Sequence, residues 1–155
     1  MRCYPPSKMC VKCGSECCCR QLSGIVHPSQ ITGKTLAIRR DKVVKMIKNG
    51  EYCIDSYSDR TMDEDIYFVR PRHTNALKKK VDFSWGGTCI FLTDKGCRLS
   101  WKNRPLGCKM LEPRKRIFDN CVNHGGDKLR QARWWKRSNL YGILLDISKG
   151  RRGEV

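Results

Sequence analysis

The residues best suited to chemistry are the cysteines near the start of the chain. Five thiols fall within ten residues, at Cys10, Cys13, Cys17, Cys18 and Cys19. Core packing does not require such spacing, whereas a Cys-x2-Cys turn followed by further cysteines presents thiolates as tetrahedral zinc or an iron–sulfur cluster needs them. Four more thiols lie far downstream, at Cys89, Cys97, Cys108 and Cys121. The sequence therefore predicts a small fold whose two ends are tied together by metal.

Metal is favoured over disulfides by the cysteine count and by the first residues. The chain has 11 cysteines, an odd number, and its N-terminus has no apolar segment of an export signal. These features indicate a reducing, cytoplasmic setting, where cysteine clusters bind metal, and neighbouring cysteines pair with each other only under strain. No apolar run approaches the roughly 18 residues of a membrane span. Histidines are alternative ligands, although a lone loop histidine is usually a surface residue; the candidates are His27, His73 and, closest to Cys121, His124.

Composition predicts a modest core and an anionic partner. Only 39% of the 155 residues are hydrophobic and 30% are charged, so metal would supply stability that the core lacks. The formal net charge is +17. Eight thiolates on two divalent ions would lower it by four, to about +13, which still attracts polyanions strongly.

Basic residues with nearby tryptophans suggest where such a partner would bind. Phosphates are contacted by Lys and Arg, and unpaired bases stack on aromatic rings, so RNA or DNA is the predicted partner, with an acidic protein as the alternative. Solvated basic faces are also common without any such role. The candidate nucleic-acid-binding residues are Lys78, Lys79, Lys80, Arg130, Arg133, Trp134, Trp135, Lys136 and Arg137.

The elements that must position these residues are predicted to form a single α+β domain over residues 1–155. This domain is expected to be irregular and stabilised by metal, with a β-hairpin and two or more helices. Helices are expected over Arg40–Asn49, with Asp41 in its first turn and Gly50 as its stop, and over about 127–147, capped by Asp127. Glu51–Asp65 is rich in acidic residues and predicts a polar loop, and 148–155 predicts a flexible tail. Short strands are expected at Gly24–Val26 and Ile66–Val69.

The downstream cysteines are expected on a hairpin and the loop after it. Thr88–Trp101 predicts two strands turning through Asp94–Gly96, with Thr93 opposite Cys97. In a regular hairpin Cys89 would then lie roughly 13 Å further along, too far for both thiols to bind one zinc. Arg104 and Pro105 end the second strand, and Arg104 is expected either to face thiolates or an anion, or to make structural hydrogen bonds.

These motifs together resemble a known family. Cys10-x2-Cys13-Gly-x2-Cys17-Cys18, Cys89-x-Phe91-Leu92, Gly96-Cys97-Arg98-Leu99 and Asn103-Arg104-Pro105-Leu106-x-Cys108, with a final Cys121, resemble the zinc- or iron-chelating CxxCxxCC (YkgJ-like) family of bacterial proteins. The resemblance covers residues 10–121, and the block from Cys89 to Cys108 is its most specific part. The chain departs from the pattern in having three residues between Cys13 and Cys17 and a third adjacent cysteine, Cys19.

The resemblance implies a metal centre of eight cysteines. Eight thiolates divide into two closed four-thiolate sites, so two zinc ions are the leading prediction and an iron–sulfur cluster is the alternative. Cys3, Cys19 and His124 are possible extra ligands. The implied ligands are Cys10, Cys13, Cys17, Cys18, Cys89, Cys97, Cys108 and Cys121.

Three functions fit this reading. The first is a binding module whose metal holds the fold while its basic surface contacts nucleic acid. The second is an iron–sulfur enzyme, because a similar cysteine domain occurs in the flagellin lysine N-methylase, although this chain has no catalytic set or glycine-rich cofactor loop that the sequence reveals. The third is metal storage or delivery, for which the surplus thiols Cys3, Cys19 and Cys53 are the only support.

Overall fold

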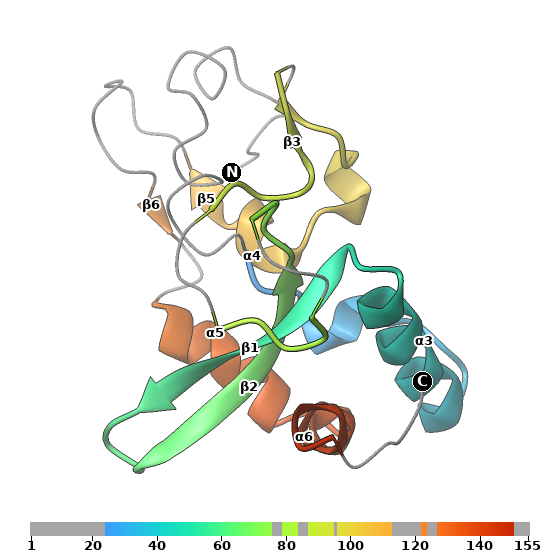
Figure 1. Ribbon diagram of the computed structural model, residues 1–155, viewed down its shortest axis with the longest axis vertical. Coiled ribbons are helices and arrows are strands. Elements are labelled where there is room, and N and C mark those ends of the chain that lie inside the picture. Colours follow the sequence, from blue (N-terminus) through green and yellow to red (C-terminus); the bar gives the residue numbers. More distant parts are fainter. Residues whose placement is uncertain are drawn as a thin grey trace.

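The fold is α+β, as predicted, and it is organised around one long antiparallel hairpin (Figure 1). The computed structural model describes residues 24–75, 79–83, 87–94, 96–112, 122–123 and 127–150. The hairpin consists of β1 (Tyr52–Asp59) and β2 (Glu64–Pro71). Packed against it are α3 (Leu36–Lys48), α5 (Lys128–Lys136) and α6 (Tyr141–Ser148).

The remaining described elements are short, and all of them except the 3-10 turn at Pro28–Gln30 gather towards the end of the molecule away from α6 (Figure 1). They form two further two-stranded sheets, one before and one after a single helical turn in the chain. They are β3 (Leu92–Thr93), β4 (Gly96–Cys97), α4 (Leu106–Lys109), β5 (Leu111–Glu112) and β6 (Val122–Asn123), with 3-10 turns η1 (Pro28–Gln30) and η2 (Trp101–Asn103). Three of the downstream cysteines lie among these short elements.

The helix predicted at Arg40–Asn49 is confirmed, but it begins earlier, at Leu36. The Thr35 hydroxyl accepts a hydrogen bond from the Ile38 backbone N–H at 3.3 Å and so caps the first turn. Asp41 therefore lies inside the helix rather than in its first turn, and its carboxylate pairs with Lys45 one turn later at 2.9 Å. Gly50, at a positive φ of 76°, follows the last turn as predicted.

The loop predicted over Glu51–Asp65 is wrong, because these residues form β1 and its turn into β2. The strand predicted at Ile66–Val69 is confirmed as the middle of β2. Ile54 pairs with Val69 in the antiparallel register, and the short connection lies at the far end of the hairpin. Hydrophobic alternation in β1 is weak because two of its buried positions are carboxylates, Asp55 and Asp59.

Both buried carboxylates are satisfied by hydrogen bonds. Asp59 accepts from the Thr61 backbone N–H at 3.1 Å and from the Thr61 hydroxyl at 2.5 Å, which shapes the turn. Arg133 of α5 donates to the same carboxylate at 2.5 Å. The Thr61 hydroxyl, followed by Arg133, lowers the pKa of Asp59 to about 2. Two acidic residues of this segment, Asp55 and Asp59, are therefore buried because they pair with arginines elsewhere in the fold.

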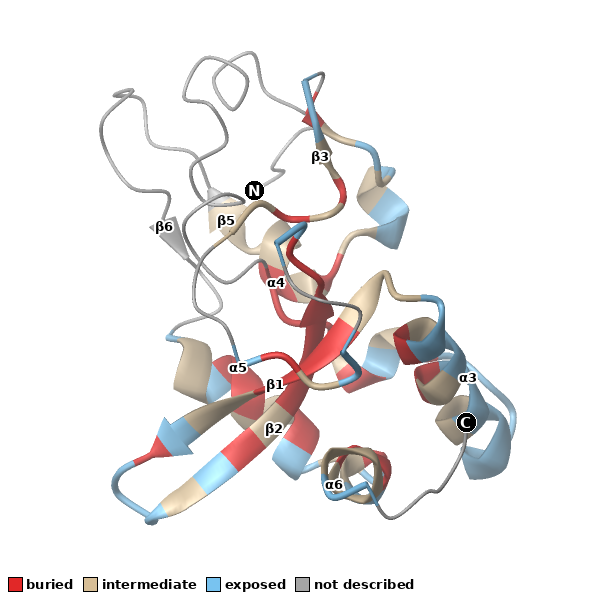
Figure 2. Ribbon diagram, in the orientation of Figure 1, coloured by how far each residue is buried: buried red, intermediate tan, exposed pale blue. Residues whose placement is uncertain are grey.

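The hydrophobic core lies between the hairpin and the three longer helices, and Figure 2 shows buried residues along the middle of both strands. Trp135 is fully buried there and its indole N–H donates to the Val26 carbonyl at 2.6 Å. Val26 in turn donates to Val69 of β2 at 2.9 Å. The strand predicted at Gly24–Val26 is wrong: apart from this one hydrogen bond to β2, these residues join no sheet among the described residues.

The single helix predicted over about 127–147 is wrong in its continuity, because α5 and α6 are separate. Asp127 caps α5 as predicted, accepting from the Arg130 backbone N–H at 2.7 Å. Leu140, Ile143 and Leu144 are buried in the core, so this region is part of the folded body and not an appendage to residues 10–121. Ser148 of the predicted tail ends α6, and residues 151–155 lie outside the described part. No helix in the described ranges combines the length and apolar character that crossing a bilayer requires.

Candidate metal centre and basic surface

Three of the predicted metal ligands, Cys89, Cys97 and Cys108, are near enough to Tyr52 to interact with it electrostatically. Burial is the main reason why the pKa of Tyr52 rises to about 12, and the negative charges of Glu51 and of these three thiols add to it. The Tyr52 ring also contacts Phe91, with 5.4 Å between ring centroids. Thiols from separate parts of the chain therefore act on one tyrosine, which is the first residue of β1.

The hairpin that carries Cys97 exists, but its predicted register is wrong by one residue. Thr93 pairs with Gly96, and Leu92 pairs with Cys97. Gly96 has a φ of 97°, as expected for the left-handed turn position, and its carbonyl accepts from the Thr93 hydroxyl at 2.7 Å. A strand of two residues leaves Cys89 outside it.

Cys89 is placed by a second set of contacts. The Leu92 N–H donates to the Cys89 carbonyl at 2.9 Å, which turns the chain, and Cys89 forms an antiparallel bridge with His73. The 13 Å separation predicted for a regular hairpin therefore does not apply, because the hairpin does not extend to Cys89.

Cys108 lies in α4, directly against the chain that follows the N-terminal cysteines. Its Sγ is 4.0 Å from the Gly24 carbonyl oxygen, and the neighbouring Gly107 N–H donates to the Ile25 carbonyl at 3.0 Å. A Cβ on Gly24 would lie 2.0 Å from the Cys108 backbone nitrogen. The two segments can approach this closely only because Gly24 and Gly107 lack side chains.

Gly24→Ala is therefore expected to destabilise the protein by about 3 kcal/mol or more, since the added methyl group meets backbone that cannot rotate away. Urea unfolding followed by tryptophan fluorescence measures the change. Gly142→Ala in α6 is the matched control, because nothing lies within 4 Å of its added Cβ. It should be neutral or stabilising by up to about 1 kcal/mol. Equal effects of the two substitutions would contradict the close crossing at Gly24.

The other predicted ligands, Cys10, Cys13, Cys17, Cys18 and Cys121, lie outside the described residues, as do Cys3, Cys19 and His124. The residue after Cys121 is described: Val122 pairs with Glu112, four positions beyond Cys108. In the described ranges, no group of three or more His, Cys, Asp or Glu side chains is arranged to hold a metal ion. Cys89, Cys97 and Cys108 therefore do not form a three-ligand site among themselves.

Two further candidates have structural roles. The His27 ring accepts from the Ser29 backbone N–H at 3.1 Å, capping η1, and burial lowers the pKa of His27. Arg104 donates through Nε to the Leu99 carbonyl at 3.1 Å, and its guanidinium lies 5.7 Å from the Trp101 ring centroid. Of the two roles predicted for Arg104, the described contacts fit structural hydrogen bonding.

Cys53, which lies outside the family pattern, belongs to the core. It is fully buried in β1, with its Sγ 3.9 Å from the Arg70 carbonyl oxygen. Burial raises the pKa of Cys53 from 9.0 to about 12, and the positive charge of Arg70 opposes the rise. Its thiol is thus held protonated at neutral pH, unlike a metal ligand.

This raised pKa predicts a loss of stability in alkali. The folded state keeps the Cys53 proton while the unfolded state releases it, so the contribution is unchanged below pH 9 and falls between pH 9 and pH 12. The slope reaches about 1.4 kcal/mol per pH unit. Cys53→Ala should flatten this part of a urea-unfolding stability profile measured from pH 8 to 11. An unchanged slope in Cys53→Ala would show that the thiol does not titrate with unfolding.

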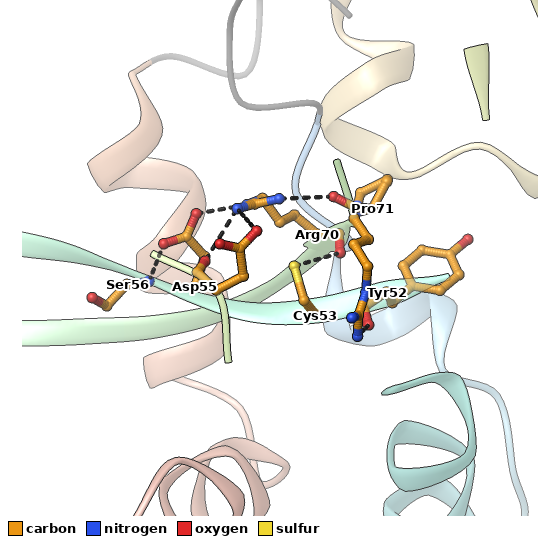
Figure 3. Close-up of polar contacts among 8 residues, drawn as sticks. Tyr52, Cys53, Asp55, Ser56, Arg70 and Pro71 are labelled. Atoms are coloured by element: carbon orange, nitrogen blue, oxygen red, sulfur yellow. Dashed lines mark hydrogen bonds and ion pairs between the residues drawn. The ribbon is translucent and has the colours of Figure 1, made fainter. Parts of the chain in front are cut away.

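A buried ion cluster, which the sequence did not suggest, lies beside Cys53 (Figure 3). Arg70 donates through Nε to Asp55 at 2.6 Å and through Nη2 to Asp82 at 3.1 Å. It also donates through Nη1 to the Pro71 carbonyl at 3.0 Å. Burial raises the pKa of Asp55, and the Arg70 charge opposes that rise. The Arg70 side chain is fully buried, so it adds nothing to the basic surface.

The basic surface of α5 is smaller than predicted. Trp135 is a core residue with no exposed surface, so it cannot stack on a base and its predicted role is wrong. The adjacent Trp134 is partly exposed instead. Arg133 is paired with Asp59, and Lys136 is paired with Glu64. Lys79 and Lys80 are exposed, whereas Lys78 lies outside the described residues.

What remains is a strip of side chains at helical spacing. Arg130 and Arg137 are exposed, and Arg133 and Trp134 lie between them, half-buried. With Asp127 and Leu129 they line a depression of about 580 Å³. We call Arg130, Arg133, Trp134 and Arg137 the α5 strip. Residues three, four and seven apart share one side of a helix, so the strip offers cations and an aromatic ring together.

In comparisons with known proteins, the chain matches no protein-family model, and no curated protein and no solved structure is significantly similar to it.

Proposed function

We propose that the protein is a metal–thiolate binding module, in which ions shared between the N-terminal cysteines and the Cys89–Cys121 region hold the fold. The observation that carries this proposal is the contact between Gly24 and Cys108. Gly24 follows Cys19 by five residues, and five residues span at most about 18 Å. The bound rises to about 25 Å for Cys17, seven residues before Gly24, so the chain length allows the thiols of Cys17 to Cys19 to reach Cys108.

Cys121 is tethered in the same way. Its neighbour Val122 pairs with Glu112, which follows α4 closely in the chain. Cys89, Cys97 and Cys108 all interact electrostatically with Tyr52, which supports one region shared by thiols from both halves of the sequence. Since the described thiols do not complete a site alone, each ion would take ligands from both halves. Two closed four-thiolate sites, each a structural zinc, are the simplest division, and the thiolates would need a reducing compartment such as the cytoplasm.

Metal and sulfide analysis of protein purified without oxygen tests this proposal. Colourless protein with about two zinc ions per chain is the expected result. Brown protein containing iron and inorganic sulfide would support the iron–sulfur alternative and with it the possibility of redox or methyl-transfer chemistry. Protein that is folded and contains neither metal would overturn the proposal.

The module is further proposed to bind a nucleic acid through its basic surface. The net charge of +17 supports a polyanionic partner, and the α5 strip together with Lys79 and Lys80 supplies exposed cations. Trp134 adds a partly exposed ring among these cations. An acidic protein would use the cations but would not need the ring.

The salt dependence of binding tests the surface. Arg130→Gln combined with Arg137→Gln should reduce the slope of log K against log salt by about 1.4, since each phosphate contact on a single strand contributes about 0.7. Fluorescence anisotropy with a labelled oligonucleotide of about twelve nucleotides measures this slope. Lys34→Gln combined with Lys48→Gln is the control, because both lysines are exposed on or beside α3 and the charge change is equal. A slope that falls equally in both variants would contradict a site at α5.

A further inference from the structure

A cleft lies over the turn end of the hairpin, next to the α5 strip. Its volume is about 750 Å³, within the range of roughly 300–1,000 Å³ found for small-ligand sites. Its lining includes the Phe83 and Tyr67 rings and the hydroxyl groups of Ser56, Ser58 and Thr61. Aromatic faces with hydroxyl groups beside them can stack on a flat ligand and hydrogen-bond to its edges.

The cleft is formed because segment 79–83 adds to the free edge of β1. The Ile54 N–H donates to the Lys80 carbonyl at 2.9 Å, and the Asp82 N–H donates to the Ile54 carbonyl at 2.8 Å. This parallel pairing places Phe83 level with Ser56, two residues beyond Ile54.

Phe83 is the exposed aromatic group at this cleft. Ser56 is opposite Tyr67 in the hairpin register, and the Phe83 and Tyr67 ring centroids are 6.4 Å apart at 54°. Phe83 is 52% exposed, whereas large apolar side chains are usually buried. Among the described residues, its one ring contact is with Tyr67. Phe83 therefore has exposed surface that a planar ligand could contact.

The charges around the cleft favour a base inside it and phosphates outside it. Asp59 in the lining is neutralised by Arg133, whereas Asp65 is exposed and accepts from the Ser58 hydroxyl at 2.6 Å. A carboxylate disfavours a phosphate in the cleft but accepts hydrogen bonds from the N–H groups of a base. Arg60 in the lining, which is exposed, supplies positive charge at the rim.

The cleft and the α5 strip are continuous. Leu129 lines both depressions, and the Arg133–Asp59 ion pair joins α5 to the floor of the cleft. We propose that this cleft holds an unpaired base of a single-stranded nucleic acid whose phosphates lie along the α5 strip. The inference rests on the proposed nucleic-acid function and adds its strandedness and the position of one base. A base in a duplex is paired and stacked, so it cannot enter.

The test compares base-bearing and abasic strands. Anisotropy titrations use labelled single strands of about twelve nucleotides, as RNA and as DNA, an abasic phosphodiester strand of the same length, and a duplex. Phe83→Ala should weaken binding of both base-bearing strands about tenfold, as expected for one lost stacking contact, and leave the abasic strand unchanged. Phe83→Ala should also leave the affinity for the duplex unchanged, because paired bases do not enter the cleft.

Met62→Ala is the matched control, because Met62 is 63% exposed at the same end of the hairpin but does not line the cleft. It should leave all affinities unchanged. If Phe83→Ala behaves like Met62→Ala, or weakens the abasic strand equally, the base site is overturned while polyanion binding stands. If the wild-type protein binds none of the strands, the proposed nucleic-acid function fails with it. Unchanged circular dichroism in both variants shows that the fold is intact.

Discussion

Cys108→Ser is expected to remove at least one metal ion and to lower the free energy of unfolding by more than about 5 kcal/mol. Structural zinc contributes on the order of 10–16 kcal/mol of apparent binding free energy in small peptides, which is comparable to the entire net stability of a domain. Serine is a poor zinc ligand at neutral pH because its hydroxyl stays protonated. Loss of the metal should also weaken the packing of the segment that begins at Gly24, since Cys108 lies directly against it.

Metal content by mass spectrometry and unfolding in urea, both under reducing conditions, measure this effect. Cys53→Ala is the control, since its thiol is buried in the core with a raised pKa. Cys53→Ala should cost the stability of a small core truncation and leave the metal count unchanged. If Cys108→Ser keeps both the metal count and the stability of the wild type, Cys108 is not a ligand.

The second large effect is expected from Arg70→Leu, which should lower the free energy of unfolding by about 3–5 kcal/mol. The substitution removes the Arg70 guanidinium, which donates to the buried carboxylates of Asp55 and Asp82. Arg98→Leu is the control: it breaks the Arg98–Glu51 ion pair, whose side chains are 49% and 46% exposed, and should cost at most about 1 kcal/mol.

A pH profile separates lost charge pairing from lost packing. Without Arg70 the buried Asp55 should take up a proton more readily in the folded state, because burial already raises its pKa and the opposing charge is gone. The excess destabilisation of Arg70→Leu should therefore shrink as the pH falls from 7 towards 4. A deficit that stays constant over that range would mean that packing, rather than the orphaned carboxylates, causes the effect.

The sequence predicted the elements whose determinants are local. Thr88–Trp101 has a turn glycine at Gly96, and Asp127 is a side-chain cap, so the hairpin and the start of α5 were recognisable. The α+β class is confirmed for the same reason. Register and helix ends were less certain because they depend on one hydrogen bond, as with the Thr35 cap that extends α3.

Features decided by distant partners were not predictable. Asp55 and Asp59 belong to strands because Arg70 and Arg133 neutralise them, and Arg133 is 74 positions away from Asp59. Likewise the choice between Trp134 and Trp135 as the buried ring depends on the Val26 carbonyl, 109 positions away from Trp135. Local composition alone assigns such residues to the surface.

For the candidate site, three predicted ligands can be placed, and the structure gathers them around Tyr52. That relation had no signal in the sequence, because Tyr52 was assigned to a loop. The remaining ligands stay predictions from their spacing and from the family resemblance. The cleft at Phe83 was also not foreseen, since an isolated aromatic residue after a lysine run does not reveal that its segment pairs with β1.

Native mass spectrometry of a chain cut between Cys19 and Gly24 tests the shared metal most directly. A protease site placed in that interval separates the N-terminal cysteines from the rest of the chain under reducing conditions. We predict that the two fragments remain one complex carrying about two zinc ions and come apart when a chelator removes them. Fragments that separate while the larger one keeps its full metal content, or that stay together after complete metal removal, would contradict ions shared between the two ends.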